Sequence, residues 1–431
     1  MKKILLILFP VLFLNQQVLA VNLFEALTEV YKNNTDLNAE RENINISEED
    51  LKISKGNYLP SVIISGSKSQ EDTSKLTNRA GTDVSVSDVD PFTQSIKIEQ
   101  TLIDLGRNAD VQKNKIGINL ASTKLLKKEQ EVLLKAIEAY SGLILANEKL
   151  KINQSNLNLL EQQVETNRAR LERGQITLSD LAQSESSLAG AQANFIQSQN
   201  EIVSNKLNYE NVIGPILDIN SLNKNFDFKL MLPNSLNDAF DASKKYNPEL
   251  IIAKLEYEQS EKDVLISRSD LSPSAKLSYE NSRSEDVSST YDERNKSILK
   301  ATISWPIFAG GKNIASLNKS KNVQDRKRLL LDSVTKTNDT NVAIAWSTFQ
   351  SSKSLLNSVE TQVKAAEIAN EGITVEYESG LGRSTLDVIQ SNSILLKAKI
   401  SLANSERNYL LTQFKLLKSI GLLNSSHLKL L

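Results

Sequence analysis

Apolar residues recur every seven positions over long stretches of this chain, and this repeat constrains the fold more than any other feature. Near the N-terminus the repeating positions are Leu23, Val30, Leu37, Ile44, Leu51 and Tyr58. A seven-residue period with polar residues between is typical of coiled-coil helices with a left-handed supercoil. Because an ordinary helical core drifts off this period within a few turns, we expect long coiled-coil hairpins.

The chain also repeats its own plan. Asn34–Leu37 resembles Asn247–Leu250 at a spacing of 213 residues, and Asp180–Gln183 resembles Asp387–Gln390 at a spacing of 207. A spacing that changes only between elements is what insertions into the loops of a duplicated chain produce. We therefore interpret the chain as two structural repeats.

The repeats define the expected domain organisation. Residues 1–20 are typical of a secretory signal peptide, with two lysines, an apolar stretch too short to span a membrane and a small-residue cleavage site. The first structural repeat is expected over 21–214 and the second over 235–421. An equatorial linker without heptads, 215–234, separates them, and a C-terminal tail, 422–431, follows.

Helix lengths indicate how each repeat is built. The middle helix is expected over 107–172, which is about 100 Å at about 1.5 Å per residue. Its antiparallel partner over 178–213 would be only about 54 Å long, and the first helix over 23–55 about 50 Å. The two shorter helices together match the long one. Each repeat is therefore predicted to be a long hairpin with one arm made in two pieces.

Four segments alternate between apolar and polar residues, at 61–68, 95–103, 275–280 and 299–305. A period of two predicts strands, and strands of about nine residues have the length of a tilted transmembrane strand. Alternation alone also fits a soluble four-stranded sheet with one wet face.

The segments that join these strands, 70–91 and 281–295, are polar and acidic and are expected to be surface loops. Four strands cannot close a membrane barrel, because small barrels begin at about eight strands. An open edge in lipid would leave backbone groups unpaired. Several copies that share one barrel and one helical tube would solve both problems, although this argument does not give their number.

Composition excludes several functions. Lys and Arg total 51 and Asp and Glu total 52, which gives a net charge of −1 and no basic excess for binding nucleic acid. Cysteine is absent and His427 is the single histidine, so thiol nucleophiles, cysteine-ligated metals and histidine triads are excluded. We expect no enzyme activity, no catalytic or metal-binding residues and no cofactor. His427 is expected to be solvated in a polar tail.

Four short motifs, in the right order within the duplicated frame, resemble the TolC family of outer-membrane channel proteins. They are Gln100–Arg107, Arg173–Gln183, Ser304–Lys312 and Tyr377–Val388. The resemblance implies an α+β membrane protein with a long periplasmic helical tunnel. It also implies a homotrimer in which each subunit contributes four strands to a shared twelve-stranded barrel in outer-membrane lipid. The motifs over 173–183 and 304–312 look most like the type I secretion branch.

The same resemblance implies a function and partners. Family members are passive exit ducts, opened by a periplasmic adaptor and an inner-membrane ABC or proton-driven transporter. Protein secretion and small-molecule efflux both fit this resemblance. It does not identify the transported substrate. The alternative is an exported structural coiled coil, such as an adhesin stalk or a periplasmic scaffold. The four alternating segments argue against that alternative, because a stalk needs no strands of membrane length.

The resemblance also places a ring of charge at the periplasmic aperture. Asp387 matches a family aspartate that faces the lumen and repeats around the trimer. Gln390 stands where the family has a second aspartate, so this ring would carry half the usual charge. Such rings set ion selectivity. Asp387 also lies three residues after Ser384 and fits a helix-capping box.

A latch for this aperture is implied by four further residues. Arg383 matches a family arginine that bonds to neighbouring hairpins, and Ser179 and Asp180 match its partners. Tyr377 resembles the latch tyrosine of the family, although this chain is one residue longer between that tyrosine and Arg383. The simpler alternatives are a solvated charge for Arg383 and a capping box with Thr177 for Asp180.

Overall fold

The computed structural model describes residues 22–84, 88–224, 230–288 and 291–430. The predicted signal peptide, 1–20, lies outside the described residues. The chain divides into two compact units. The hairpin unit comprises Met1–Asn38, Leu126–Asn247 and Thr337–Leu431, and the sheet unit comprises Ala39–Leu125 and Pro248–Lys336.

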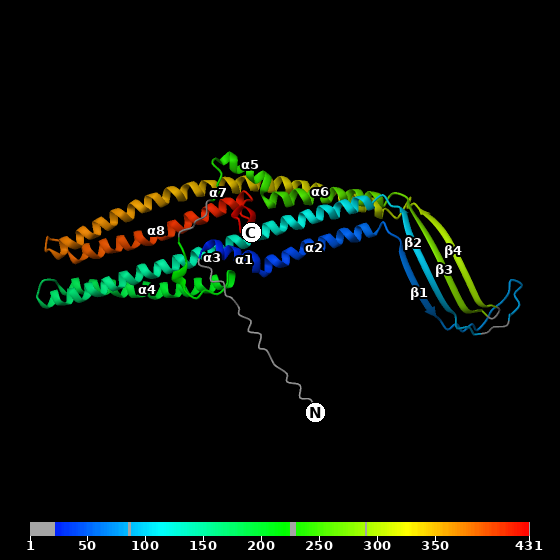
Figure 1. Cartoon of the computed structure of the whole chain (residues 1–431), viewed down its shortest axis with the longest axis horizontal. Coiled ribbons are helices and arrows are strands. Elements are labelled where there is room, and N and C mark those ends of the chain that lie inside the picture. The colour runs from blue at the N-terminus through cyan, green and yellow to red at the C-terminus, as the bar shows by residue number, and fades with distance from the viewer. Residues whose placement is uncertain (1–21, 85–87, 225–229, 289–290, 431) are drawn as a thin grey trace, which may run out of the picture. The chain divides into compact units, whose positions relative to one another are not determined.

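Long helices dominate both repeats (Figure 1). The helices of the first repeat are α1 (Leu23–Asn33), α2 (Thr35–Gly56), α3 (Arg107–Glu172) and α4 (Leu178–Val212). Those of the second are α5 (Leu236–Tyr246), α6 (Pro248–Ser269), α7 (Lys312–Glu378) and α8 (Thr385–Ser419). A short 3₁₀ turn, Ile219–Ser221, lies between the repeats, and α9 (Ser425–Leu428) follows the second. The long helix predicted over 107–172 is confirmed by α3.

The single first helix expected over 23–55 is instead two helices, and the second repeat breaks at the matching place. Asn34 has an extended backbone, and its side chain accepts the N–H of Leu37 at 3.0 Å, so it starts a new helix. In the second repeat Asn247 precedes Pro248, whose ring removes an N–H and disfavours helical backbone in the residue before it. Heptad spacing continues through both breaks, and therefore the periodicity did not reveal them.

The strands form one antiparallel sheet in the order β1-β2-β3-β4 among the described residues, and Figure 1 shows them side by side. Their bounds are β1 Ser61–Lys68, β2 Phe92–Ile103, β3 Ser274–Ser288 and β4 Tyr291–Ser304. The expectation that 281–295 is a loop is wrong, because β3 and β4 stay paired as far as Glu285 and Glu293. In this polar extension Arg283 forms an ion pair with Glu293 of β4 at 3.3 Å and another with Glu285 of its own strand at 3.0 Å.

Arg107 fixes the junction between the sheet and α3. Its side chain is 8% exposed, and its guanidinium donates to the carbonyl of Thr101 at 2.8 Å and to that of Asn57 at 3.0 Å. The same group lies 4.9 Å from the ring centre of Tyr58. The final residue of the Gln100–Arg107 motif therefore ties the end of β2 to the end of α2, which orients the strands on their helices.

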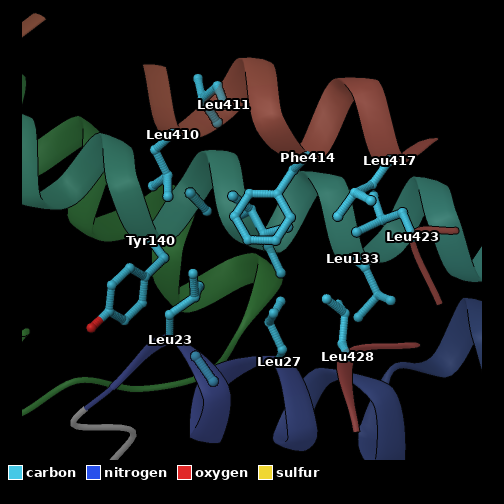
Figure 2. Packing of buried hydrophobic residues seen from close by; sticks show 14 of the residues in the cluster. Leu23, Leu27, Leu133, Tyr140, Leu410, Leu411, Phe414, Leu417, Leu423 and Leu428 are labelled. Carbon is cyan, nitrogen blue, oxygen red and sulfur yellow. The ribbon is translucent and has the colours of Figure 1, made fainter. Parts of the chain in front are cut away.

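The main core lies in the hairpin unit, where α1, α3, α8 and the C-terminal residues meet (Figure 2). Leu27, Leu133 and Phe414 are completely buried there. The C-terminal segment is part of this core, since Leu428 is 4% exposed and the buried Glu129 carboxylate accepts the N–H of Ser425.

The expectation of a solvated His427 is therefore wrong. Its Nε2 atom is buried and has no hydrogen-bond partner among the described residues. Leucines on either side of it are buried: Leu423, Leu428 and Leu430.

A lysine of the linker between the repeats, Lys224, attaches this segment to two of the long helices. Lys224 forms ion pairs with Glu148 of α3 at 2.6 Å and with Glu406 of α8 at 2.5 Å. One cation thus joins a helix of the first hairpin to a helix of the second.

Two buried tyrosines of the hairpin unit give a test of the core. Tyr140 donates its hydroxyl to the carbonyl of Asn223 at 3.1 Å, whereas the Tyr209 hydroxyl is buried without a partner among the described residues. Burial raises the pKa of Tyr209 to about 12. We expect Tyr140→Phe to lower the free energy of unfolding by about 1 kcal/mol, because it removes the hydrogen bond between the Tyr140 hydroxyl and the Asn223 carbonyl.

Tyr209→Phe removes a hydroxyl that makes no bond, so we expect it to leave stability unchanged or to raise it. Chemical unfolding of the two purified variants in detergent compares them directly. Equal destabilisation by both substitutions would contradict this description of the core.

Candidate functional site: the hairpin tips

The two hairpin tips are tight turns built on glycine. Five residues, 173–177, join α3 to α4, and six, 379–384, join α7 to α8. Gly174 has a φ of +73°, and Gly380 and Gly382 have φ values of +73° and +82°. These are left-handed conformations that glycine adopts without steric cost. The second tip is thus one residue longer and has one more left-handed glycine.

Each helix that leaves a tip begins with a capping box, as the sequence predicted. Asp180 accepts the N–H of Thr177 at 3.0 Å, and Asp387 accepts that of Ser384 at 2.9 Å. In both boxes the N–H and then the hydroxyl of the cap residue hold the pKa of the carboxyl below its usual range. Both aspartates are therefore charged at neutral pH, and each has a structural role within its own hairpin.

Arg383 forms its ion pair with Glu376, seven residues earlier in the chain. Its Nε atom lies 2.6 Å from the Glu376 carboxylate, and 43% of each side chain is exposed. An exposed pair of this kind contributes little to stability. Within the described subunit no ion pair joins Arg383 to Asp180. The pairing of Arg383 with Ser179 and Asp180 stays a prediction that concerns a neighbouring subunit.

Tyr377 joins the second hairpin to the first. Its hydroxyl lies 3.1 Å from the side-chain oxygen of Asn167 on α3 and 3.1 Å from the hydroxyl of Thr385 on α8. The guanidinium of Arg170 lies 4.4 Å from the centre of the Tyr377 ring. Asn167 is completely buried, and its amide donates to Ser184 on α4 at 2.7 Å. One tyrosine and one asparagine therefore connect four helices.

Asn167 and Thr385 are not among the site residues predicted from the sequence. Asn167 lies three residues after the heptad position Val164, so an amide in a coiled-coil seam was the available signal. Of the six predicted residues, Asp180, Tyr377 and Arg383 line one pocket of about 480 Å³ between the hairpins. Ser179, Asp387 and Gln390 do not line it. Ser179 and Gln390 are exposed.

The described residues include no group of three or more metal-ligating side chains. Across the described helices, none is both long enough and apolar enough to cross a membrane.

The profile of the outer membrane efflux protein family matches residues 26–214 and 240–422, which is most of the chain and follows its two repeats. The chain belongs to this family. It is 25% identical to the outer membrane efflux protein BepC of Brucella suis biovar 1 over 424 residues, which covers 96% of this chain and 88% of BepC. It is 22% identical to the alkaline protease secretion protein AprF of Pseudomonas aeruginosa, over 80% of this chain and 72% of AprF.

Solved channel structures share the fold. The crystal structure of the Campylobacter jejuni CmeC outer membrane channel matches with a TM-score of 0.80 at 16% identity, over 93% of this chain and 85% of CmeC. The helix-rich duplicated architecture and the four antiparallel strands are thus those of an outer-membrane channel protein. The predicted channel function, outer-membrane location and absence of enzyme activity are confirmed by the family. The alternative of a stalk or scaffold without a pore is not favoured.

Removal of the Asn167 amide tests its link between the hairpins. Asn167→Ala leaves the hydroxyls of Ser184 and Tyr377 without this partner, and we expect a loss of about 1–3 kcal/mol. Hydrogen exchange should then speed up at both tips. Asn158→Ala is the matched control, because Asn158 lies on the same helix and is exposed. Equal exchange at the tips of the two variants would show that Asn167 does not couple the hairpins.

Proposed function

We propose that the chain is the exit duct of a tripartite type I secretion system, which carries protein from the periplasm to the exterior without catalysis of its own. Channels of this family are trimers that work with a periplasmic adaptor and an inner-membrane pump, and we extend this assembly to the present chain. The pump would be an ABC transporter, whose ATP hydrolysis drives export. The name of the relative AprF, a protease secretion protein, supports the secretion branch.

The observation that carries the proposal is the incomplete sheet. Among the described residues of one subunit, β1 and β4 each pair on one side only, and the hydrophobic side chains of β1 are exposed. Unpaired edges in lipid are strongly unfavourable. Three subunits with four strands each would close a barrel of twelve strands. The profile matches over 26–214 and 240–422 support the proposed repeats over 21–214 and 235–421.

The proposal assigns the aperture to the hairpin tips. Asp387, repeated in three subunits, would form the ring at the narrowest point, and Gln390 would leave that ring with one charge per subunit. Arg383 would exchange Glu376 for Ser179 and Asp180 of a neighbouring subunit when the aperture closes. Tyr377 would hold the two hairpins of one subunit together through Asn167.

Efflux of small molecules, driven by a proton-coupled pump, is the second candidate. It is favoured by the match to BepC, a named efflux protein, over 96% of this chain. Deletion of the gene separates the two functions. Loss of a protein from the culture medium would support secretion, and sensitivity to toxic small molecules without such a loss would support efflux.

Charge reversal at the latch tests the proposed aperture. Arg383→Glu places a carboxylate beside Glu376 and, in the trimer, near Asp180, so repulsion should open the tip. We expect single-channel conductance in planar lipid bilayers to rise severalfold. Arg173→Glu, an exposed charge reversal in the other tip, is the matched control and should change conductance less. Conductance of Arg383→Glu equal to that of the unmodified channel would rule out the latch.

A further inference from the structure

The antiparallel register divides the side chains of the sheet between two faces. Paired residues project to the same side, and the side alternates along each strand. One row of the apolar face consists of the paired residues Val62, Ile98, Tyr279 and Leu299. Neighbouring rows on this face contribute Ile64, Ile96, Ala275, Leu277, Ala301 and Ile303. Charged residues enter this face only at its outer end, at Arg283 and beyond.

The opposite face, here named the charged face, is cationic. It carries five basic side chains and three carboxylates, a net charge of +2: Lys97, Lys276, Arg294, Lys296, Lys300, Glu99, Glu280 and Asp292. The residues that β1 adds to this face are uncharged: Ser61, Ile63, Ser65 and Ser67. This local excess contrasts with the net charge of −1 for the whole chain.

The basic side chains of β4 differ from those of β2 and β3 in their ion pairs. Glu99 is shared by two lysines, at 2.8 Å from Lys97 and 3.4 Å from Lys276. Arg294, Lys296 and Lys300 form no ion pair with any described residue, and all three are exposed. They lie two and four residues apart on β4, so all three project to the same side, and the resulting strip of positive charge runs along the edge of the sheet.

The solvent preferences of the two faces determine which one contacts lipid and which one lines the lumen. Lysine and arginine on the lipid-facing side of a membrane barrel are unfavourable, whereas apolar side chains are favoured there. The apolar face therefore contacts lipid, and the charged face lines the water-filled lumen. Basic side chains that line a pore favour the passage of anions.

We propose that the charged face makes the lumen of the sheet region selective for anions, so that the channel favours negatively charged solutes and cargo. The residues that determine this preference are Arg294, Lys296 and Lys300. The proposal rests on the proposed function in one respect, namely that the sheet forms the wall of a pore. It is independent of the tips, where the Asp387 carboxylate favours cations.

Reversal potentials across planar bilayers in a potassium chloride gradient measure this selectivity. The parent channel should carry Asp387→Asn, which removes the opposing charge at the tip and leaves the sheet dominant. We expect this parent to prefer chloride. Combined replacement of Arg294, Lys296 and Lys300 by Gln should shift the reversal potential toward that of potassium. An unchanged reversal potential in the triple variant would overturn the proposal.

A variant of opposite sign controls for general damage to the barrel. Glu280→Gln removes a carboxylate from the same face, so the reversal potential should shift further toward chloride. A shift toward potassium, or no shift, would contradict the assignment of this face to the lumen. Trimers of every variant are first confirmed by their migration before and after heating.

A charged peptide tests the preference for anionic cargo. A short polyglutamate peptide added at the sheet end should block the current of the parent channel, and the triple variant should lose this block. Polylysine of equal length is the control and should block neither. Block by polylysine in place of polyglutamate would overturn the proposal. Trimers that form no channels at all would contradict the proposed function itself, whereas channels with unaltered selectivity would contradict only the present inference.

Discussion

The backbone of the four-stranded sheet imposes the constraint from which the rest of the structure follows. The strands bond to one another in sequence, and therefore β1 and β4 are left with one unpaired side each. One face of the sheet is apolar and suited to lipid, where unpaired N–H and C=O groups are very unfavourable. A subunit with such a sheet is incomplete alone. We propose that its channel function depends on other copies that supply the missing hydrogen bonds.

The hairpin tips show how small polar contacts control a large helical structure. Long coiled-coil seams are apolar and resemble one another, so they fix the register of two helices weakly. Buried polar pairs, such as Asn167 with Ser184, fix it specifically, because an unpaired amide in the seam is unfavourable. Tyr377 extends the same network to the second hairpin. An exposed ion pair such as that of Arg383 and Glu376 adds little stability and is easily exchanged, which suits the change of partner that we propose for Arg383.

Much of this fold could be predicted from the sequence because its signals are periodic. The heptads and glycines predicted the observed first and last residues of α3. The alternation at Ser61–Lys68 predicted the bounds of β1. The failures occurred where tertiary contacts override the local pattern. The cross-strand ion pair of Arg283 with Glu293 helps to keep a polar segment in strands, and the core of the hairpin unit buries the segment around His427. The capping boxes at Thr177 and Ser384 were visible, whereas the amide of Asn167 in the seam gives no local indication that it bonds to Tyr377, 210 positions away.

Cysteine cross-linking of the sheet edges tests the central claim most directly, because the chain has no cysteine of its own. Within one subunit two strands separate β1 from β4, at about 4.8 Å per strand spacing, and a disulfide requires Cα atoms within about 7 Å. A disulfide between these strands must therefore join two subunits. We predict that cysteine pairs scanned along β1 and β4 give cross-linked species of two and three chains in outer-membrane fractions. Single chains at every pair of positions would contradict a sheet completed by neighbouring copies.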